Sequence, residues 1–259
     1  GLCGAQHCIF EALDTKVFAT SSQTTPDNTH HVDVLLAALS ELKDAVPHLA
    51  ADAAKRVAGL LETTYHDNWR VRRALNKILP AVAAKQGRNA FEAQLLEGYV
   101  RSFQDRICEV RASAVEALAQ LRDLEPVSQD RNSPTSHDGV NIFDADWLMD
   151  RIGKRLSELY LTMSYYVYRI TIVQAFEKLA YNYKLADHHM ETVILFLTDA
   201  ARDDVPNVRF TAVRALETAS NIASDRLVSN LIKPVLNELL VNDADADVKC
   251  SVSGVFATV

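Results

Sequence analysis

The most constraining feature of this sequence is a two-residue motif, an apolar or aromatic residue followed by a basic one, that returns at a nearly regular interval. The basic residues of successive motifs lie 39, 58, 40 and 40 positions apart. Asp33 lies a further 39 positions before the first of them and fits as a sixth copy with its charge reversed. A period near 40 residues is typical of helical repeat arrays, in which each unit packs on its neighbours. The motifs are Val71-Arg72, Val110-Arg111, Tyr168-Arg169, Val208-Arg209 and Val248-Lys249.

Between the motifs, apolar residues recur at helical spacing, which predicts helices joined in pairs by short polar turns. Each motif begins the second helix of a pair, and Gly87 is expected to cap one helix at its C-terminus. Two helices per unit favour HEAT repeats over armadillo repeats. We therefore predict an all-α HEAT-repeat solenoid, a stack of antiparallel helix pairs wound as a right-handed superhelix. The predicted pairs are 49–65 with 69–85, 89–104 with 108–124, 143–162 with 167–184, 187–202 with 205–223, and 224–241 with 247–259.

The motif spacing divides the chain into four parts, and its one long interval of 58 residues indicates an insertion. Residues 1–31 are predicted to be a partial repeat and a loop, and 32–124 and 142–259 to be HEAT repeats. Residues 125–141, EPVSQDRNSPTSHDGVN, are polar and helix-breaking and account for the extra length. Because this insertion joins two consecutive repeats, we expect it to be mobile and to lie opposite the turns within the repeats.

Composition narrows the possible classes of protein. Only 8 Gly and 7 Pro occur in 259 residues, too few for an all-β sandwich or barrel. The net charge of −7 argues against nucleic acid as a partner, and no apolar run is long enough to cross a membrane. Four cysteines do not make a disulfide framework, so we expect a reducing compartment, the cytoplasm with the nucleus as a second location. The chain opens at Gly1 without an initiator Met, so we expect N-terminal repeats to be missing.

No catalytic motif of the GxSxG, Walker A or GxGxxG type occurs, so the chain is predicted to be no enzyme and to need no cofactor. Cys3, His7 and Cys8 could form part of a metal site, but their spacing matches no standard zinc pattern, and ordinary thiols are the alternative. The neighbouring pairs His30-His31 and His188-His189 are expected to point to different faces, because adjacent residues do not share a helix face. We therefore predict no metal.

The basic residue of each motif has two interpretations, a structural ladder between repeats or a binding site. Acidic residues occupy the turns that precede the motifs, at Asp67, Asp105, Asp204 and Asp245. An arginine fork can bind such an acid, or a turn carbonyl, of its own or of the next repeat. We predict the structural ladder for Arg72, Arg111, Arg169, Arg209 and Lys249.

The turns that precede the motifs carry side chains of another kind. The turns read Asn68-Trp69-Arg70, Ser164-Tyr165-Tyr166 and Val205-Pro206-Asn207. In a solenoid such turns align along one edge, and Trp, Tyr and Arg are the side chains that dominate protein interfaces. The alternative, which spacing alone leaves open, is that these side chains pack beneath their own repeat.

Three stretches of the sequence resemble the scaffolding A subunit family of protein phosphatase 2A. They are HDNWRVRRALNKILPAVAAKQGRNAFEAQLLEGYV, DDVPNVRFTAVRALE and KPVLNELLVNDADADVKCSV, and the resemblance extends over 32–259 apart from the insertion. It implies a non-catalytic HEAT scaffold. The turns of its last repeats would hold a phosphatase catalytic subunit, and earlier repeats would hold B-type regulatory subunits. Another HEAT adaptor, such as a nuclear transport receptor or an assembly factor, is the alternative.

The resemblance also assigns partner-binding residues, turn by turn. The first turn matches the family at Asn68, Trp69 and Arg70. The second turn departs from it, because Cys108 stands where the family has an aromatic residue and Arg106 beside it is also unlike the family. The later turns match at Tyr166, Val205 and Asn207.

Overall fold

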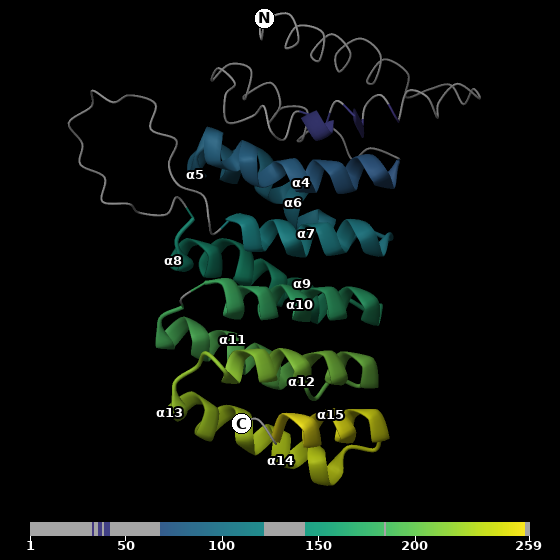
Figure 1. The fold of residues 1–259 in the computed structure, drawn as a ribbon, viewed down its shortest axis with the longest axis vertical. Helices are drawn as coiled ribbons and strands as arrows, with labels where there is room; N and C mark the ends of the chain where they lie inside the picture. Colours follow the sequence, from purple (N-terminus) through teal and green to yellow (C-terminus); the bar gives the residue numbers. More distant parts are fainter. Residues whose placement is uncertain are drawn as a thin grey trace, which may run out of the picture.

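The computed structural model describes residues 68–121, 143–183 and 185–256, together with Asp33, Leu36, Ala37, Leu39, Ser40 and Glu41. Within these residues the chain is a stack of antiparallel helices and contains no strand (Figure 1). The arrangement confirms the prediction of an all-α repeat solenoid. Residues 1–31, most of 32–67 and the insertion 125–141 lie outside the described residues.

The second helices of the repeats form one layer of the stack. Neighbouring members of this layer pack side by side along its whole length (Figure 1). Each of them contains the motif that defines the repeat, close to its first turn. The helices are α4 (Trp69–Gln86), α7 (Cys108–Leu121), α10 (Tyr166–Asn182), α12 (Pro206–Ser220) and α15 (Ala246–Phe256).

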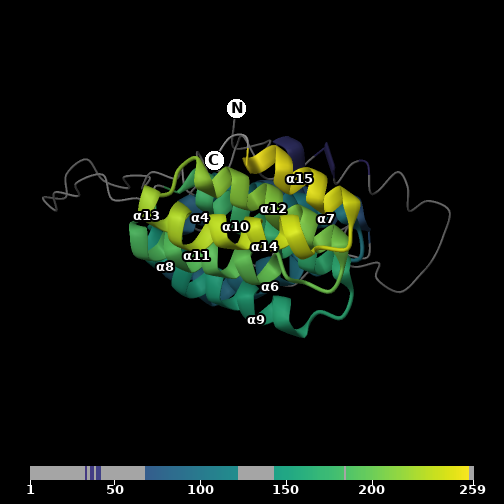
Figure 2. The same cartoon turned by 90° about the horizontal axis from the view of Figure 1, so that it is seen from below.

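The first helices form the other layer, which Figure 2 shows beneath the second helices when the molecule is viewed along the stack. Three of them contain a five-residue π-helical turn, a feature that the sequence pattern does not predict. The first helices are α5 (Arg88–Ala90), η3 (Phe91–Leu95) and α6 (Leu96–Ser102); α8 (Ala145–Leu148), η4 (Met149–Gly153) and α9 (Lys154–Thr162); α11 (Asp187–Ala200); and α13 (Asp225–Leu227), η5 (Val228–Ile232) and α14 (Lys233–Asn242).

Two residues explain where α4 begins and ends. Asn68 is its N-cap, and the side-chain oxygen of Asn68 accepts a hydrogen bond of 2.9 Å from the backbone N–H of Arg70. Gly87 ends the helix with φ at +80° and donates its N–H to the Ala83 carbonyl at 2.9 Å. Glycine adopts a positive φ without a steric penalty, so the predicted cap at Gly87 is confirmed.

The core lies between the two layers and runs through the whole stack. Its largest fully buried side chains include Tyr99, Phe103 and Phe176. The two buried tyrosine hydroxyls satisfy carbonyls of α7: Tyr99 donates to Ala114 at 2.8 Å and Tyr183 to Leu118 at 2.6 Å. Burial raises the pKa of Tyr99 well above its usual value. The Tyr99 hydroxyl therefore remains a protonated donor, and the two hydrogen bonds join α7 to the helices on either side.

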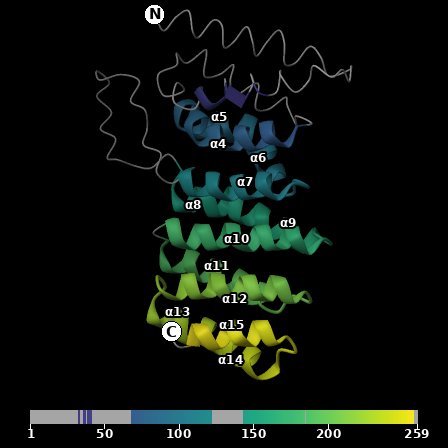
Figure 3. The ribbon, with the colours of Figure 1, turned by 45° about the vertical axis from the view of Figure 1, so that its right-hand side comes forward.

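The two edges of the stack carry different connections. The turns within repeats lie along one edge, on the right in Figure 1, and the connections between repeats lie along the opposite edge. Figure 3 shows the same separation after a 45° rotation. The described residues that flank the insertion, at the end of α7 and the start of α8, lie on the edge that carries the connections between repeats (Figure 1).

Candidate functional site

We use the name turn ridge for the edge formed by residues 68–70, 103–108, 161–168, 201–207 and 240–245. It contains the start of α4, the four described turns within repeats and the helix residues next to those turns. Residues far apart in the sequence are thereby aligned on one side of the molecule. Ion pairs between successive repeats, which we call the ladder, lie beside these turns. Large side chains are exposed along the same edge.

Three arginines of the second helices form two-pronged ion pairs with an aspartate in the turn of the following repeat. Nε and a terminal nitrogen of each guanidinium donate to the two oxygens of one carboxylate. The distances are 2.6 and 3.0 Å for Arg72 with Asp105, 2.8 and 2.9 Å for Arg169 with Asp203, and 2.7 and 2.7 Å for Arg209 with Asp243. Paired hydrogen bonds of this kind fix orientation as well as distance. Each pair therefore sets how two repeats stack.

The same groups also order the turns themselves. Each of the three aspartates accepts a hydrogen bond of 2.8 to 2.9 Å from the backbone N–H of the residue two positions later in the chain. The remaining guanidinium nitrogen of Arg169 donates to the Met163 carbonyl at 2.8 Å, and that of Arg209 donates to the Asp203 carbonyl at 3.0 Å. An arginine in this position thus holds its own turn and the next one.

The electrostatics of Asp203 and Asp243 follow from these contacts. Burial alone would raise the pKa of Asp203, but hydrogen bonds from Arg169, Tyr160 and the Val205 N–H hold that pKa below its usual value. Hydrogen bonding from Arg209 lowers the pKa of Asp243, and burial opposes it only in part. Burial and the hydrogen bond to Asp203 raise the pKa of Tyr160. Both aspartates are therefore ionised at neutral pH.

Arg111 and Lys249 depart from this pattern. Met163 stands where the other turns have their aspartate, and Arg111 donates instead to the Thr171 hydroxyl at 3.0 Å and the Asp105 carbonyl at 2.7 Å. Its guanidinium also lies 5.4 Å from the centre of the Tyr168 ring. Lys249 donates to the Val241 carbonyl at 3.1 Å.

Two of the acids expected to pair with the arginines of the ladder, Asp204 and Asp245, do not form the two-pronged ion pairs, which we call forks. Asp203 takes the place expected for Asp204, and Asp243 takes the place expected for Asp245. The carboxylate of Asp245 instead accepts the N–H groups of Asp247 and Val248 at the start of α15. Asp67 lies outside the described residues.

The exposed part of the turn ridge is apolar and aromatic at its centre. Leu161 at the end of α9 is 84% exposed and Tyr165 is 56% exposed. The Tyr165 ring packs edge-on against Tyr166 and Tyr168, with centroids 5.6 Å apart in both pairs. One end of the turn ridge adds Val241, which is 71% exposed. Among the described residues, the exposed Leu240 also lies on the turn ridge, whereas Tyr181, Leu195 and Ile222 lie outside it. A group of such side chains, rather than a single one, marks a surface that binds other molecules.

The structure places the predicted partner-binding residues in two groups. Arg70, Arg106, Cys108 and Asn207 are exposed or largely so, whereas Asn68, Trp69, Tyr166 and Val205 are half-buried. Within the second group, Asn68 caps α4, and Tyr166 and Val205 pack against the core.

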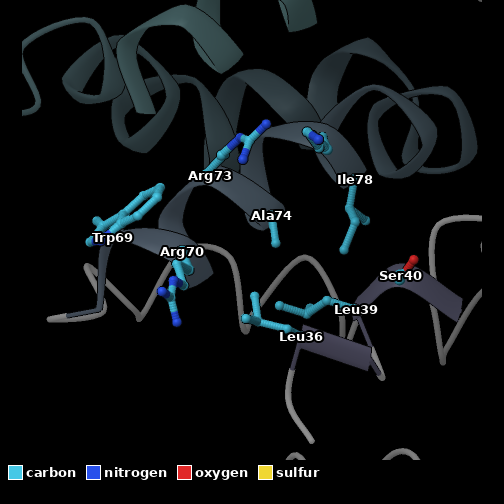
Figure 4. A pocket seen from close by; sticks show the side chains of 9 residues that line it. Leu36, Leu39, Ser40, Trp69, Arg70, Arg73, Ala74 and Ile78 are labelled. Carbon is cyan, nitrogen blue, oxygen red and sulfur yellow. The ribbon is translucent and has the colours of Figure 1, made fainter. Parts of the chain in front are cut away.

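Trp69 and Arg70 lie together at the start of α4. The guanidinium of Arg70 lies 5.7 Å from the centre of the Trp69 ring, a cation–π distance. Both side chains line one end of a pocket of about 400 Å³, where Leu36 and Leu39 face Ala74 and Ile78 (Figure 4). Trp69 is therefore half-buried and lies beside a positive charge.

Leu161 and Val241 were missed as candidate site residues. Both lie in the last turn of a first helix, just before the turn into the second helix. An aliphatic residue directly before the polar residues that begin the turn, as in Leu161-Thr162 and Val241-Asn242, is the sequence signal that could have identified them.

The expectation that adjacent histidines point to different faces is wrong for His188 and His189. Their ring centroids lie 3.9 Å apart, and their nitrogens lie within 4.8 Å of one another and of a carboxylate oxygen of Asp146. The side chains converge because both residues lie in the first turn of α11, where no preceding turn restricts their rotamers. The other candidate ligands, Cys3, His7, Cys8, His30 and His31, lie outside the described residues.

Comparison with known proteins adds a sequence relative. No family model matches the chain. The regulatory A subunit of protein phosphatase PP2A from Saccharomyces cerevisiae is 32% identical over 117 residues, which cover 42% of this chain and 18% of that protein. Over this segment the chain is similar to a phosphatase regulatory subunit. It spans less than a fifth of that relative's length.

Solved structures support the fold alone. The crystal structure of Cex1p matches with a TM-score of 0.62 at 12% identity and covers 99% of this chain and 42% of that one. The TOG domain array of Crescerin matches with a TM-score of 0.51 at 16% identity and covers 90% and 89%. Both are far too divergent in sequence to suggest a shared partner. Among the described helices, none has the length and apolar character that crossing a membrane requires.

Proposed function

We propose that this protein is a non-catalytic scaffold whose turn ridge binds the catalytic subunit of a serine/threonine phosphatase of the PP2A type. The observation that carries the proposal is an exposed aromatic and aliphatic surface on a rigid ladder, in a chain similar to the regulatory A subunit of PP2A. B-type regulatory subunits would bind through repeats that precede those described.

The turn ridge has the properties of a protein interface. Tyr and Trp bury a large area with few rotatable bonds, and they recur among the residues that dominate binding energy. Tyr165 provides an exposed aromatic side chain in one repeat, with the exposed Leu161 beside it in the same turn, and Trp69 provides a half-buried one in another repeat. Full burial of a leucine side chain contributes about 2 kcal/mol, so Leu161 alone has much to gain from a partner.

The ladder beneath the turn ridge makes this surface rigid before binding. Arg169 fixes the turn that carries Tyr165 through the carbonyls of Met163 and Ser164, at 2.8 and 3.2 Å. A surface already in its bound conformation loses little conformational entropy on association. The ladder thus supports the interface without contacting the partner.

A matched pair of tyrosines on α10 tests the proposal. Tyr165 lies at the start of this helix on the turn ridge and is 56% exposed, whereas Tyr181 lies at its other end and is 65% exposed. In biolayer interferometry with a purified PP2A-type catalytic subunit, Tyr165→Ala should raise Kd at least about tenfold, or roughly 1.4 kcal/mol. Tyr181→Ala should leave Kd within about twofold, because its side chain lies on the opposite edge.

Trp69 provides an independent test at another turn. Trp69→Ala should weaken binding by about 2 kcal/mol, as loss of an aromatic interface anchor does, while the melting temperature stays close to that of wild type. The alternative, that Trp69 only packs beneath its repeat, predicts normal binding and a lower melting temperature. Failure of the wild-type protein to bind the catalytic subunit would contradict the proposal and favour another HEAT adaptor.

A further inference from the structure

A cluster of metal-ligating side chains lies between two first helices, apart from the turn ridge. Asp146 belongs to α8, and His188 and His189 belong to the first turn of α11. We propose that these three residues bind one divalent transition-metal ion of the Zn²⁺ class and that the ion joins two consecutive repeats. This inference is independent of the proposed phosphatase partner.

The potential ligand atoms of the three residues lie close together. Nε2 of His189 lies 2.5 Å from an Asp146 oxygen, and one ligand atom from each of the three residues lies within 4.8 Å of the others. Around a tetrahedral zinc ion with bonds of about 2.0 to 2.2 Å, ligand atoms lie roughly 3.4 Å apart. The cluster therefore needs only small side-chain rotations to enclose an ion.

The exposure of the residues permits those rotations. Asp146 has 84% of its side chain in solvent, so its carboxylate can move away from His189 without breaking other packing. His189, with 15% of its side chain exposed, is the better-fixed ligand. An ordered imidazole on one helix and a mobile carboxylate on another can adjust to the distances that an ion imposes.

The ligand set indicates the class of ion. Two imidazoles and one carboxylate suit Zn²⁺, Cu²⁺ and Ni²⁺, whereas Mg²⁺ and Ca²⁺ prefer oxygen ligands. Three protein ligands leave one position of a tetrahedral site for water. The nearby cations pair with other acids, Arg88 with Asp144 and Arg226 with Glu191, so salt bridges already hold them away from the cluster.

Binding would couple the ion to the stability of the stack. Asp146 and the histidines belong to consecutive repeats, so an ion that contacts both binds the stacked state better than the separated one. A ligand specific to the folded state raises the melting temperature as its concentration exceeds Kd. We therefore expect added Zn²⁺ to raise the melting temperature through this joint.

The test counts bound ions in the full chain, without a polyhistidine tag. Native mass spectrometry and calorimetry with Zn²⁺ alone should detect one ion fewer in His188→Gln/His189→Gln and in Asp146→Asn than in wild type. Asp150→Asn is the matched control, because Asp150 is 67% exposed on the next turn of the same helical segment. It should keep the wild-type number of ions and the wild-type rise in melting temperature.

A local reporter separates this site from histidines and cysteines elsewhere in the chain. The chain has two tryptophans, so in a Trp69→Phe background all tryptophan emission comes from Trp147, which adjoins Asp146. Cu²⁺ should quench this emission, and His188→Gln/His189→Gln should raise the Cu²⁺ concentration for half quenching at least about tenfold, since loss of groups that only orient metal ligands already costs that much. An unchanged ion count and unchanged quenching in that variant would overturn the proposal.

Discussion

Asp203 of the ladder accepts hydrogen bonds from three different residues, and removal of its charge tests whether the ladder holds the repeats together. Its carboxylate accepts two hydrogen bonds from Arg169, one from the Tyr160 hydroxyl at 2.6 Å and one from the Val205 N–H at 2.9 Å. Its side chain is 7% exposed and that of Arg169 is 14% exposed. Asp203→Asn keeps the size of the side chain and removes its charge.

The expected magnitude follows from the bonds that the amide cannot reproduce. Asparagine keeps one oxygen, which still accepts from the Val205 N–H and from one nitrogen of Arg169. Its NH₂ group replaces the oxygen that accepts from Nε of Arg169, so one charged hydrogen bond becomes a donor–donor contact. Tyr160 can accept from the new NH₂. Loss of one charge-assisted bond beside a largely buried guanidinium should lower the free energy of unfolding by about 2 to 3 kcal/mol.

The assay is urea unfolding followed by circular dichroism, with amide hydrogen exchange of peptides from α10 and α12. Local exchange is needed because a repeat array can open at one joint without unfolding as a whole. Asp204→Asn is the control: this neighbouring residue is exposed and its side chain holds no fork, so the change should stay within about 0.5 kcal/mol. A cost below about 0.5 kcal/mol for Asp203→Asn, or equal effects of both variants, would refute the ladder's role.

Two further outcomes follow from the described residues. Folding lowers the pKa values of Asp203 and Asp243, so their contribution to stability is complete above the unfolded pKa of about 4 and is lost as pH falls through the folded pKa. The urea concentration at half unfolding, measured from pH 6 to pH 2, should therefore decrease once the pH is below about 4. The decrease should be less steep in Asp203→Asn/Asp243→Asn. In thermal unfolding, Gly87→Ala should lower the free energy of unfolding by about 1 kcal/mol because Gly87 has a positive φ. Gly98→Ala within α6 should raise it by about 0.5 to 1 kcal/mol, although a Cβ at either glycine meets no close neighbour. Equal effects of the two variants would contradict the backbone argument.

The sequence predicts the arginines of the ladder better than their partners, for a physical reason. The motif spacing places each basic residue at the same point of a helix, but two of the turns contain more than one aspartate. The aspartate that pairs with an arginine also accepts a hydrogen bond from the backbone N–H of the residue two positions later. Among the described turns, only Asp105, Asp203 and Asp243 have the place in the turn that allows both contacts. Each lies six positions before the basic residue of its own motif, a spacing that could have identified them.

The candidate site was predictable only in outline. Helical periodicity aligns the turns on one edge, which is why residues such as Arg70 and Asn207 lie there and are exposed. Periodicity does not determine how far a side chain extends from its helix end, and so it missed Leu161 and Val241. The convergence of His188 with its neighbour depends on side-chain rotamers in a first helical turn, which residue spacing does not specify.

The joint between α7 and α10 combines the loss of a fork with the inserted segment 125–141, yet the helices there remain stacked (Figure 1). At this joint Met163 replaces the aspartate, so Arg111 makes weaker bonds to neutral acceptors. The compensation lies in the other layer, where Phe91, Phe143 and Trp147 form three edge-to-face pairs at 5.0 to 5.9 Å. Each such pair contributes about 0.5 to 1.5 kcal/mol beyond the burial of area, and each of the two charged hydrogen bonds of a fork contributes about 1.5 to 3 kcal/mol, so the three pairs together offset much of the missing fork. The repeats can therefore tolerate a long insertion at this joint without a break in the stack that holds the turn ridge straight.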